Sequence, residues 1–265
     1  MYMRYLIIFS GLMALINAKD AAAASVEESV QHSHFDFKGT VTKVNAATLP
    51  QIRPTASTII VKVDEVVHAP PILGDYTGKE VTVRLNQPGG VRTGQQFVFF
   101  TTSWMFGSSI AVREIHRTQA EPDMSSVRRR VAEARRTVAD NKLQNRLTHA
   151  ELVVVGRVSV VRAAPENIRR DSVAEHDAGW EEAVIQIESV LKGQINEQSI
   201  VILFPSSGDV MWKSAPKFRE GEEGTWVLRR ERMRGLPPTE EYFTALNPRD
   251  FHSKDQLDRI KRLVR

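Results

Sequence analysis

The chain contains an internal repeat, and this repeat limits its possible folds more than any other feature. Residues 182–193 match residues 59–69, which lie about 120 positions earlier. In both segments β-branched apolar residues alternate with polar ones up to a turn, which is typical of a half-buried strand. Three flanking matches follow in the same order: residues 37–44 with 154–161, 79–85 with 198–204, and 94–100 with 221–228. The sequence therefore predicts a duplicated β-domain.

Each half is predicted to fold as a small barrel. The first domain occupies residues 37–117 and the second residues 149–248. Five short strands separated by glycine and proline turns fit a closed or partly open OB-like barrel, in which closure removes exposed strand edges. A β-sandwich is the main structural alternative. The predicted strands span residues 37–44, 58–67, 80–85, 96–103 and 109–115, and then 152–162, 182–193, 200–204, 224–230 and 242–246.

Two helices complete the predicted fold, which is mainly β with two tandem OB-like five-stranded β-barrels, a joining helix and a C-terminal helix. The linker, residues 118–148, carries apolar residues at helical spacing from Val127 to Val138, behind a candidate N-cap at Asp123. Its other face is basic. The C-terminal segment, residues 249–265, is predicted to be helical from Ser253, which forms a capping box pattern with Gln256.

The N-terminus predicts export. Residues 5–16 form an apolar run that is too short to span a bilayer and has the length of a signal-peptide core. Cleavage after Ala18 or after Ala24 is compatible with the small residues that follow, and residues 1–24 are assigned as the signal peptide. Residues 25–36 are predicted to be a flexible leader. We expect a periplasmic or secreted protein with no stable membrane insertion once the signal is removed.

The second half also resembles a known superfamily. Its strand and turn residues at 154–158, 184–193 and 218–228 are similar to those of the bacterial relatives of the netrin-like and tissue-inhibitor-of-metalloproteinase superfamily. Those domains are OB-type barrels, so the resemblance implies that fold here. In the animal inhibitors an amino-terminal cysteine chelates the zinc of the target protease. This chain has no cysteine, so the resemblance carries no functional residue over to it.

Candidate binding residues fall into a basic set and an aromatic set. Residues 123–147 hold seven basic against three acidic side chains, which favours an anionic ligand, whereas an exported protein is not expected to meet nucleic acid. Two tryptophans are predicted at strand or loop edges, where large apolar groups favour protein interfaces or cap the barrel ends. The candidates are Arg128, Arg129, Arg135 and Arg136 in the basic set, and Trp180 and Trp212 in the aromatic set.

No catalytic, cofactor or metal signature stands out in the sequence. The first alternative to binding is a hydrolase that uses His176 as a base with Asp177 and a nearby hydroxyl, although no nucleophile elbow accompanies them. His32 and His34 stand two apart and are interpreted as a solvated pair rather than metal ligands. The expected function is therefore a non-enzymatic, protein-interaction or inhibitor-like module at the cell envelope. The second alternative is an anionic-polymer or nucleic-acid binder that uses the basic helix.

Overall fold

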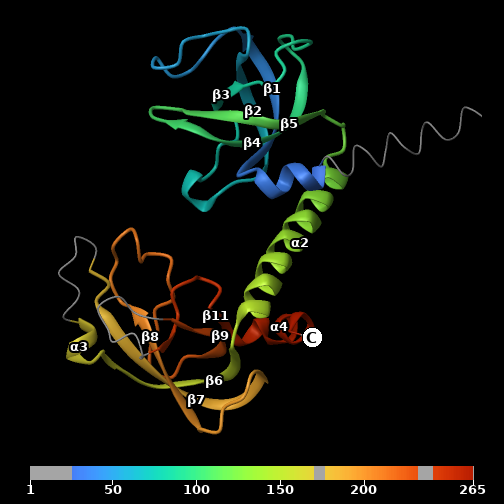
Figure 1. Cartoon of the computed structure of the whole chain (residues 1–265). Coiled ribbons are helices and arrows are strands. Elements are labelled where there is room, and N and C mark those ends of the chain that lie inside the picture. The colour runs from blue at the N-terminus through green and yellow to red at the C-terminus, as the bar shows by residue number, and fades with distance from the viewer. Residues whose placement is uncertain (1–25, 170–176, 232–240, 265) are drawn as a thin grey trace, which may run out of the picture. The chain divides into compact units, whose positions relative to one another are not determined.

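The computed structural model describes residues 26–169, 177–231 and 241–264. The chain divides into two compact units, unit 1 ending at Val138 and unit 2 beginning at Ala139. Each unit holds one β-sheet. The long helix α2 (Ser125–His149) lies between the two sheets in the chain, so its first part belongs to unit 1 and its last part to unit 2 (Figure 1).

Unit 1 is a closed five-stranded barrel, with its strands coloured blue to green in Figure 1. The order around the barrel is β1-β2-β3-β5-β4, and β4 pairs back onto β1. All neighbours are antiparallel except β3 and β5, which run parallel. The strands are β1 (Phe35–Val44), β2 (Thr58–His68), β3 (Glu80–Arg84), β4 (Gln96–Phe106) and β5 (Ile110–Gln119), with a short 3-10 helix η1 (Pro71–Leu73) before β3.

Unit 2 contains a six-stranded sheet in the order β10-β8-β7-β6-β9-β11, in which β10 also pairs with β9. The ring β6-β7-β8-β10-β9 thus repeats the ring of unit 1, including a parallel pair, here β8 with β10. The strands are β6 (Leu152–Ala163), β7 (Trp180–Lys192), β8 (Ser199–Pro205), β9 (Glu223–Glu231), β10 (Tyr242–Thr244) and β11 (Phe251–Ser253), with the short helix α3 (Glu166–Arg169) after β6.

The residue register confirms the predicted duplication. Strand β1 has irregularities in its pairing with β2 at three points, the second of which lies just before Gly39. Strand β6 has three irregularities at the aligned positions, the second just before Gly156. A Cβ atom would lie 2.5 Å from Cγ1 of Val61 at Gly39 and 2.2 Å from the carbonyl oxygen of Gln186 at Gly156. Glycine is therefore required at this bulge in both barrels, since any side chain would overlap the neighbouring strand.

Each barrel has its own apolar core. The core of unit 1 is aromatic, with Phe37 stacked on Phe99 at 5.4 Å between ring centroids. The core of unit 2 is centred on Trp226, which packs against Phe218 and Phe251. Phe37, Phe99 and Trp226 lie on inward faces of their strands, as the alternating pattern predicts, whereas Phe218 comes from the loop between β8 and β9.

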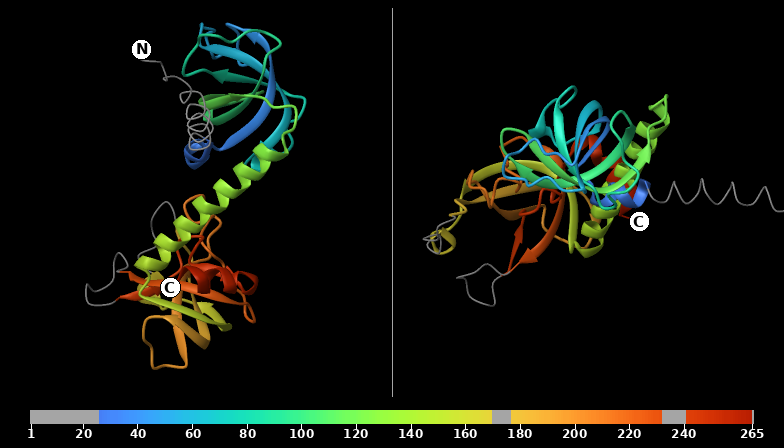
Figure 2. Two further views of the ribbon diagram at one scale, coloured as in Figure 1. Left: turned by 90° about the vertical axis from the view of Figure 1, so that its right-hand side faces the viewer. Right: turned by 90° about the horizontal axis from the view of Figure 1, so that it is seen from above.

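Helix α2 covers the outer face of the same strand in both units. In unit 1, Val127 and Val131 of the helix pack with Val98 and Phe100 of β4. In unit 2, Leu143 and Leu147 pack with Val227 of β9. Strands β4 and β9 are therefore buried on both faces, which explains their continuous apolar runs. The left view of Figure 2 shows α2 along its length.

The N-terminal leader is not flexible over its described residues, so that prediction is wrong. Residues 26–32 form a short helix. Val26 and Val30, four positions apart, are buried against the first part of α2 and the outer face of β4. The helix is held by this packing, because an isolated helix of such length is unstable in water.

The C-terminal helix is present but begins later than expected. Ser253 precedes a 3-10 turn η2 (Lys254–Gln256), and the α-helix α4 (Leu257–Leu263) follows. The predicted capping box does not form, because the Ser253 hydroxyl donates to Asp255 and makes no capping hydrogen bond. Ile260 of α4 is buried beside Leu143 and Leu147. Ser253 instead ends β11, a strand that the sequence analysis did not predict.

Candidate functional site

The four candidate arginines of α2 differ in what they contact. Arg128 pairs with Glu65 at 2.6 Å, with both side chains partly in solvent. Arg135 reaches a buried carboxylate, Asp36, at 2.6 Å. Arg129 and Arg136 are exposed. The structure thus engages two of the four in ion pairs with barrel 1 and leaves the other two at the surface.

The Arg135–Asp36 pair anchors α2 to barrel 1. Asp36 is fully buried, and its Oδ2 accepts from Nη2 of Arg135. The same Nη2 lies 3.1 Å from the hydroxyl of Ser33. Burial raises the pKa of Asp36 above its usual value, although the Arg135 guanidinium pulls it in the other direction. The pair holds the first part of the helix on the barrel, because separating the two side chains would leave the buried carboxylate of Asp36 without its ion-pair partner.

A second buried pair in unit 2 was not predicted. Arg146 of α2 contacts Oδ1 of Asp250 through both Nε and Nη2, each at 2.6 Å. The other carboxylate oxygen, Oδ2, accepts the backbone N–H groups of Leu246 at 2.9 Å and Asn247 at 2.8 Å. Asp250 lies in the segment between β10 and β11, which carries no sequence signal for such a role. Each part of α2 therefore has one arginine fixed by a buried aspartate.

The two candidate tryptophans lie together. Trp180 begins β7, and Trp212 lies in the loop between β8 and β9. Their ring centroids are 5.5 Å apart with an interplanar angle of 63°, an edge-to-face contact. Trp180 also packs with Leu203 and Ile168. Both tryptophans are half-buried, so each keeps part of its ring at the surface of unit 2.

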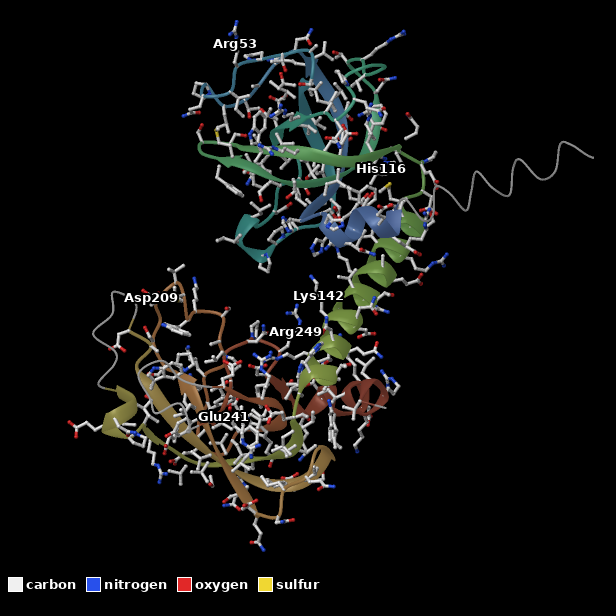
Figure 3. All side chains as sticks on the ribbon, in the orientation of Figure 1. Arg53, His116, Lys142, Asp209, Glu241 and Arg249 are labelled. Atoms are coloured by element: carbon white, nitrogen blue, oxygen red, sulfur yellow. The ribbon has the colours of Figure 1, made fainter. Side chains whose placement is uncertain are left out.

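The loop that carries Trp212 is held by hydrogen bonds. Asp209 accepts from the N–H of Met211 through Oδ1 at 2.8 Å and from the N–H of Trp212 through its carbonyl at 3.0 Å. The Lys217 ammonium donates to the carbonyls of Pro205 and Trp212. Burial lowers the pKa of Lys217. These contacts fix a tight turn after Asp209, which Figure 3 labels.

This turn presents two large apolar side chains to solvent. Val210 is 82% exposed and Met211 is 59% exposed. We call residues 209–212 the apolar turn. Of these four residues, only Trp212 was a candidate binding residue from the sequence. The exposure of adjacent apolar residues on an ordered turn is unusual, because a soluble protein gains nothing by ordering apolar groups in water.

Two residues near the proposed hydrolase site, Asp177 and Ser206, make hydrogen bonds to backbone groups of Gly179. Oδ1 of Asp177 accepts the N–H of Gly179 at 2.8 Å, and the Ser206 hydroxyl donates to the carbonyl of Gly179 at 2.6 Å. The hydroxyl proton is thus engaged by a carbonyl rather than by a base. His176 lies outside the described residues, so its part in the hypothesis stays a prediction.

His32 and His34, which the sequence analysis interpreted as a solvated pair, differ in their contacts. His34 lies with Nδ1 3.2 Å from the Thr102 hydroxyl, and His32 is exposed. Burial lowers the pKa of His68 and of His116. Within residues 26–169, 177–231 and 241–264, no group of three or more histidine, cysteine or acidic side chains is placed to hold a metal ion.

Trp104 of unit 1 combines apolar packing with contacts to charged groups. Trp104 of β4 is half-buried and lies near two arginines, with Cζ of Arg84 at 5.5 Å and Cζ of Arg113 at 5.9 Å from the ring centroid. It lines a pocket of about 370 Å³ together with Ile52 and Met105. Both guanidinium groups are within the range of a cation–π contact, so the tryptophan is held by charge as well as by packing.

Comparison with known proteins assigns no family to this chain. No protein-family model matches it, and no curated protein is similar to it. Among the described residues, none of the helices has the length and apolar character needed to cross a membrane.

Proposed function

We propose that this chain is an exported binding protein whose second barrel recognises a protein partner through the apolar turn. The observation that carries the proposal is the exposure of Val210 and Met211 on a turn fixed by Asp209. An ordered turn loses little conformational entropy on binding, so its apolar surface contributes directly to affinity. Trp212, the last residue of the apolar turn, makes the edge-to-face contact with Trp180, and such aromatics are enriched at interface centres.

The partner we propose is a protein with an apolar cleft that accepts two neighbouring side chains. The apolar turn protrudes, so a complementary surface has to be concave. Export supplies the compartment, and it is supported by the signal-like pattern of residues 1–24. The relationship to netrin-like domains is also a proposal, and it rests on the strand and turn pattern of residues 154–228.

The test compares a turn variant with a matched surface variant. Val210→Asp with Met211→Asp places charges where the partner is expected to bury apolar groups. Ile72→Asp is the control, because Ile72 is 92% exposed in unit 1 and lies outside the apolar turn. Tagged proteins capture partners from envelope extracts, quantified by mass spectrometry, and the dissociation constant of any captured protein is then measured with purified components.

We expect the turn variant to weaken binding by at least about 2 kcal/mol, or roughly thirtyfold in Kd, and the control to leave it unchanged. Both variants should melt at the wild-type temperature, because these side chains make few contacts in the free protein. Equal capture by the turn variant and the wild type would refute the proposal. Export is tested separately by the N-terminal residue of the mature protein, expected at Lys19 or Ser25.

A further inference from the structure

A pocket of about 390 Å³ in unit 2 is lined by basic side chains. Four of its seven lining residues carry a full positive charge, and none carries a carboxylate. They come from three elements: the last part of α2, strand β9, and the segment between β10 and β11. The lining residues are Lys142, Asn145, Arg146, His149, Arg229, Asn247 and Arg249.

Arg146 lines this pocket and is fixed by an ion pair. Its Nε and Nη2 contact Asp250, which is itself held by two backbone N–H groups. The two contacts with Asp250 therefore fix the orientation of the guanidinium. Arg146 lines the pocket, and its N–H groups that do not contact Asp250 are the donors we assign to a ligand. A donor that is already fixed loses no rotamer freedom when a ligand binds.

Two further cations are not neutralised. Lys142 and Arg249 form no ion pair with any described residue, and Figure 3 shows both side chains on the same side of α2. The backbone N–H of Arg249 donates to Oδ1 of Asn247 at 3.0 Å, which fixes the turn that presents this arginine. Arg229 contributes a fourth cation, although it also pairs with Glu231 at 2.7 Å.

The balance of charge is positive. Against Lys142, Arg146, Arg229 and Arg249 stand the carboxylates of Asp250 and Glu231, so four positive and two negative groups leave a net charge of +2. A phosphate monoester carries about −1.5 to −2 at pH 7 and has three acceptor oxygens. Arginine forks match the oxygens of such a group in pairs. A single carboxylate would leave much of this charge uncompensated.

We propose that this pocket binds the phosphate group of a small phosphorylated molecule. Arg146, Arg249 and Lys142 hold the phosphate oxygens, and the amides of Asn145 and Asn247 lie beside them as neutral hydrogen-bonding groups. The volume is at the low end of pockets that hold small ligands, which leaves room for an organic part of modest size. The site shares no residue with the apolar turn, so it stands or fails independently of the proposed protein partner.

The experiment is calorimetric titration of the full mature chain with inorganic phosphate, glycerol 3-phosphate and acetate. We expect both phosphates to bind and acetate to bind more weakly by at least about tenfold. Lys142→Ala with Arg249→Ala should weaken phosphate binding by at least about tenfold, because two charge-assisted contacts are lost. Lys261→Ala with Arg262→Ala is the control, since it removes two exposed charges from α4 in the same unit.

Three results would overturn the proposal. The first is that the wild type binds no phosphate at a phosphate concentration of about 10 mM, which is about ten times a Kd of 1 mM. The second is an equal loss in both double variants, which would indicate general attraction by the net charge. The third is equal affinity for acetate and phosphate. Circular dichroism checks that each variant is folded, and the single variant Lys142→Gln, expected to weaken phosphate binding severalfold, replaces the double variant if the latter unfolds.

Discussion

Replacing Arg135 with alanine tests whether the arginines of α2 serve the fold or a ligand. The Arg135 side chain is 24% exposed, whereas that of its partner Asp36 is 0% exposed. The substitution removes the hydrogen bond between Nη2 and Oδ2 at 2.6 Å and leaves a buried carboxylate without its ion-pair partner. Ser33 and His68 remain near it and compensate only in part.

The expected cost follows from the burial of Asp36. Breaking a buried ion pair costs about 3–5 kcal/mol, and the partial exposure of Arg135 favours the lower end, about 3 kcal/mol. Arg128→Ala should cost less than about 1 kcal/mol, because its pair with Glu65 is largely in solvent. Arg129→Ala and Arg136→Ala should each change stability by no more than about 0.5 kcal/mol.

The cost should also depend on pH. Burial raises the pKa of Asp36, and loss of Arg135 raises it further, so protonation favours the folded state of the variant. When the pKa of a carboxyl group is higher in the folded state than in the unfolded state, the stability that the group contributes is fully present below its unfolded-state pKa. This stability is lost as pH rises through its folded-state pKa. The penalty of Arg135→Ala should therefore be smaller at pH 5 than at pH 7.5.

Hydrogen exchange followed by mass spectrometry separates the two units. A loss of about 3 kcal/mol should speed exchange of the most protected amides of β1 and β4 by roughly a hundredfold, since each 1.4 kcal/mol is tenfold. Peptides from β6 and β9 should keep their rates. The reasoning is wrong if Arg135→Ala exchanges like Arg129→Ala, or if the penalty grows toward low pH.

Three further predictions concern unit 2. Gly156→Ala should destabilise unit 2 by about 1–3 kcal/mol or more, because the new Cβ would lie 2.2 Å from the carbonyl oxygen of Gln186. Gly208→Ala is the control and should not destabilise it, because no heavy atom lies within 4 Å of a Cβ at that position. Urea unfolding of the two variants compares their stabilities. Burial lowers the pKa of His252 below its usual 6.5, so the stability that neutral His252 contributes is present above pH 6.5 and is lost as pH falls below it. Between pH 7.5 and 5.5 the melting temperature of the wild type should therefore drop more than that of His252→Gln. Equal drops would contradict this prediction. A double-mutant cycle of Trp180→Ala and Trp212→Ala should give a coupling of about 0.5–1.5 kcal/mol, and additive losses would show that the edge-to-face contact is not stabilising.

The barrels could be predicted because their signal is local and occurs twice. Alternation of apolar and polar residues shows which face of a strand is buried, and this holds for each strand without knowledge of its neighbours. Residues 97–100 are apolar on both faces, and the structure buries both: Phe97 and Phe99 in the barrel, Val98 and Phe100 under α2. The match of residues 94–100 with 221–228 is confirmed by the shared register.

Short elements could not be predicted in the same way. The helix over residues 26–32 has only Val26 and Val30 as an apolar signal, and strand β11 has three residues. Neither is stable alone, and each exists because a tertiary surface receives it. The capping box at Ser253 failed for the same reason, since pairing of β11 with β9 fixes Ser253 as the end of a strand.

The sequence by itself determined the repeat, the strands, the basic helix and the two tryptophans as separate features. Only the tertiary structure decided which of them meet: Trp180 with Trp212, Arg135 with Asp36, and Arg146 with Asp250. The physical reason is that periodicity encodes burial over neighbouring residues, whereas these contacts join residues 32, 99 and 104 positions apart. Closing each barrel and laying α2 on it brings those side chains within reach, and nothing in the local pattern specifies such a distance.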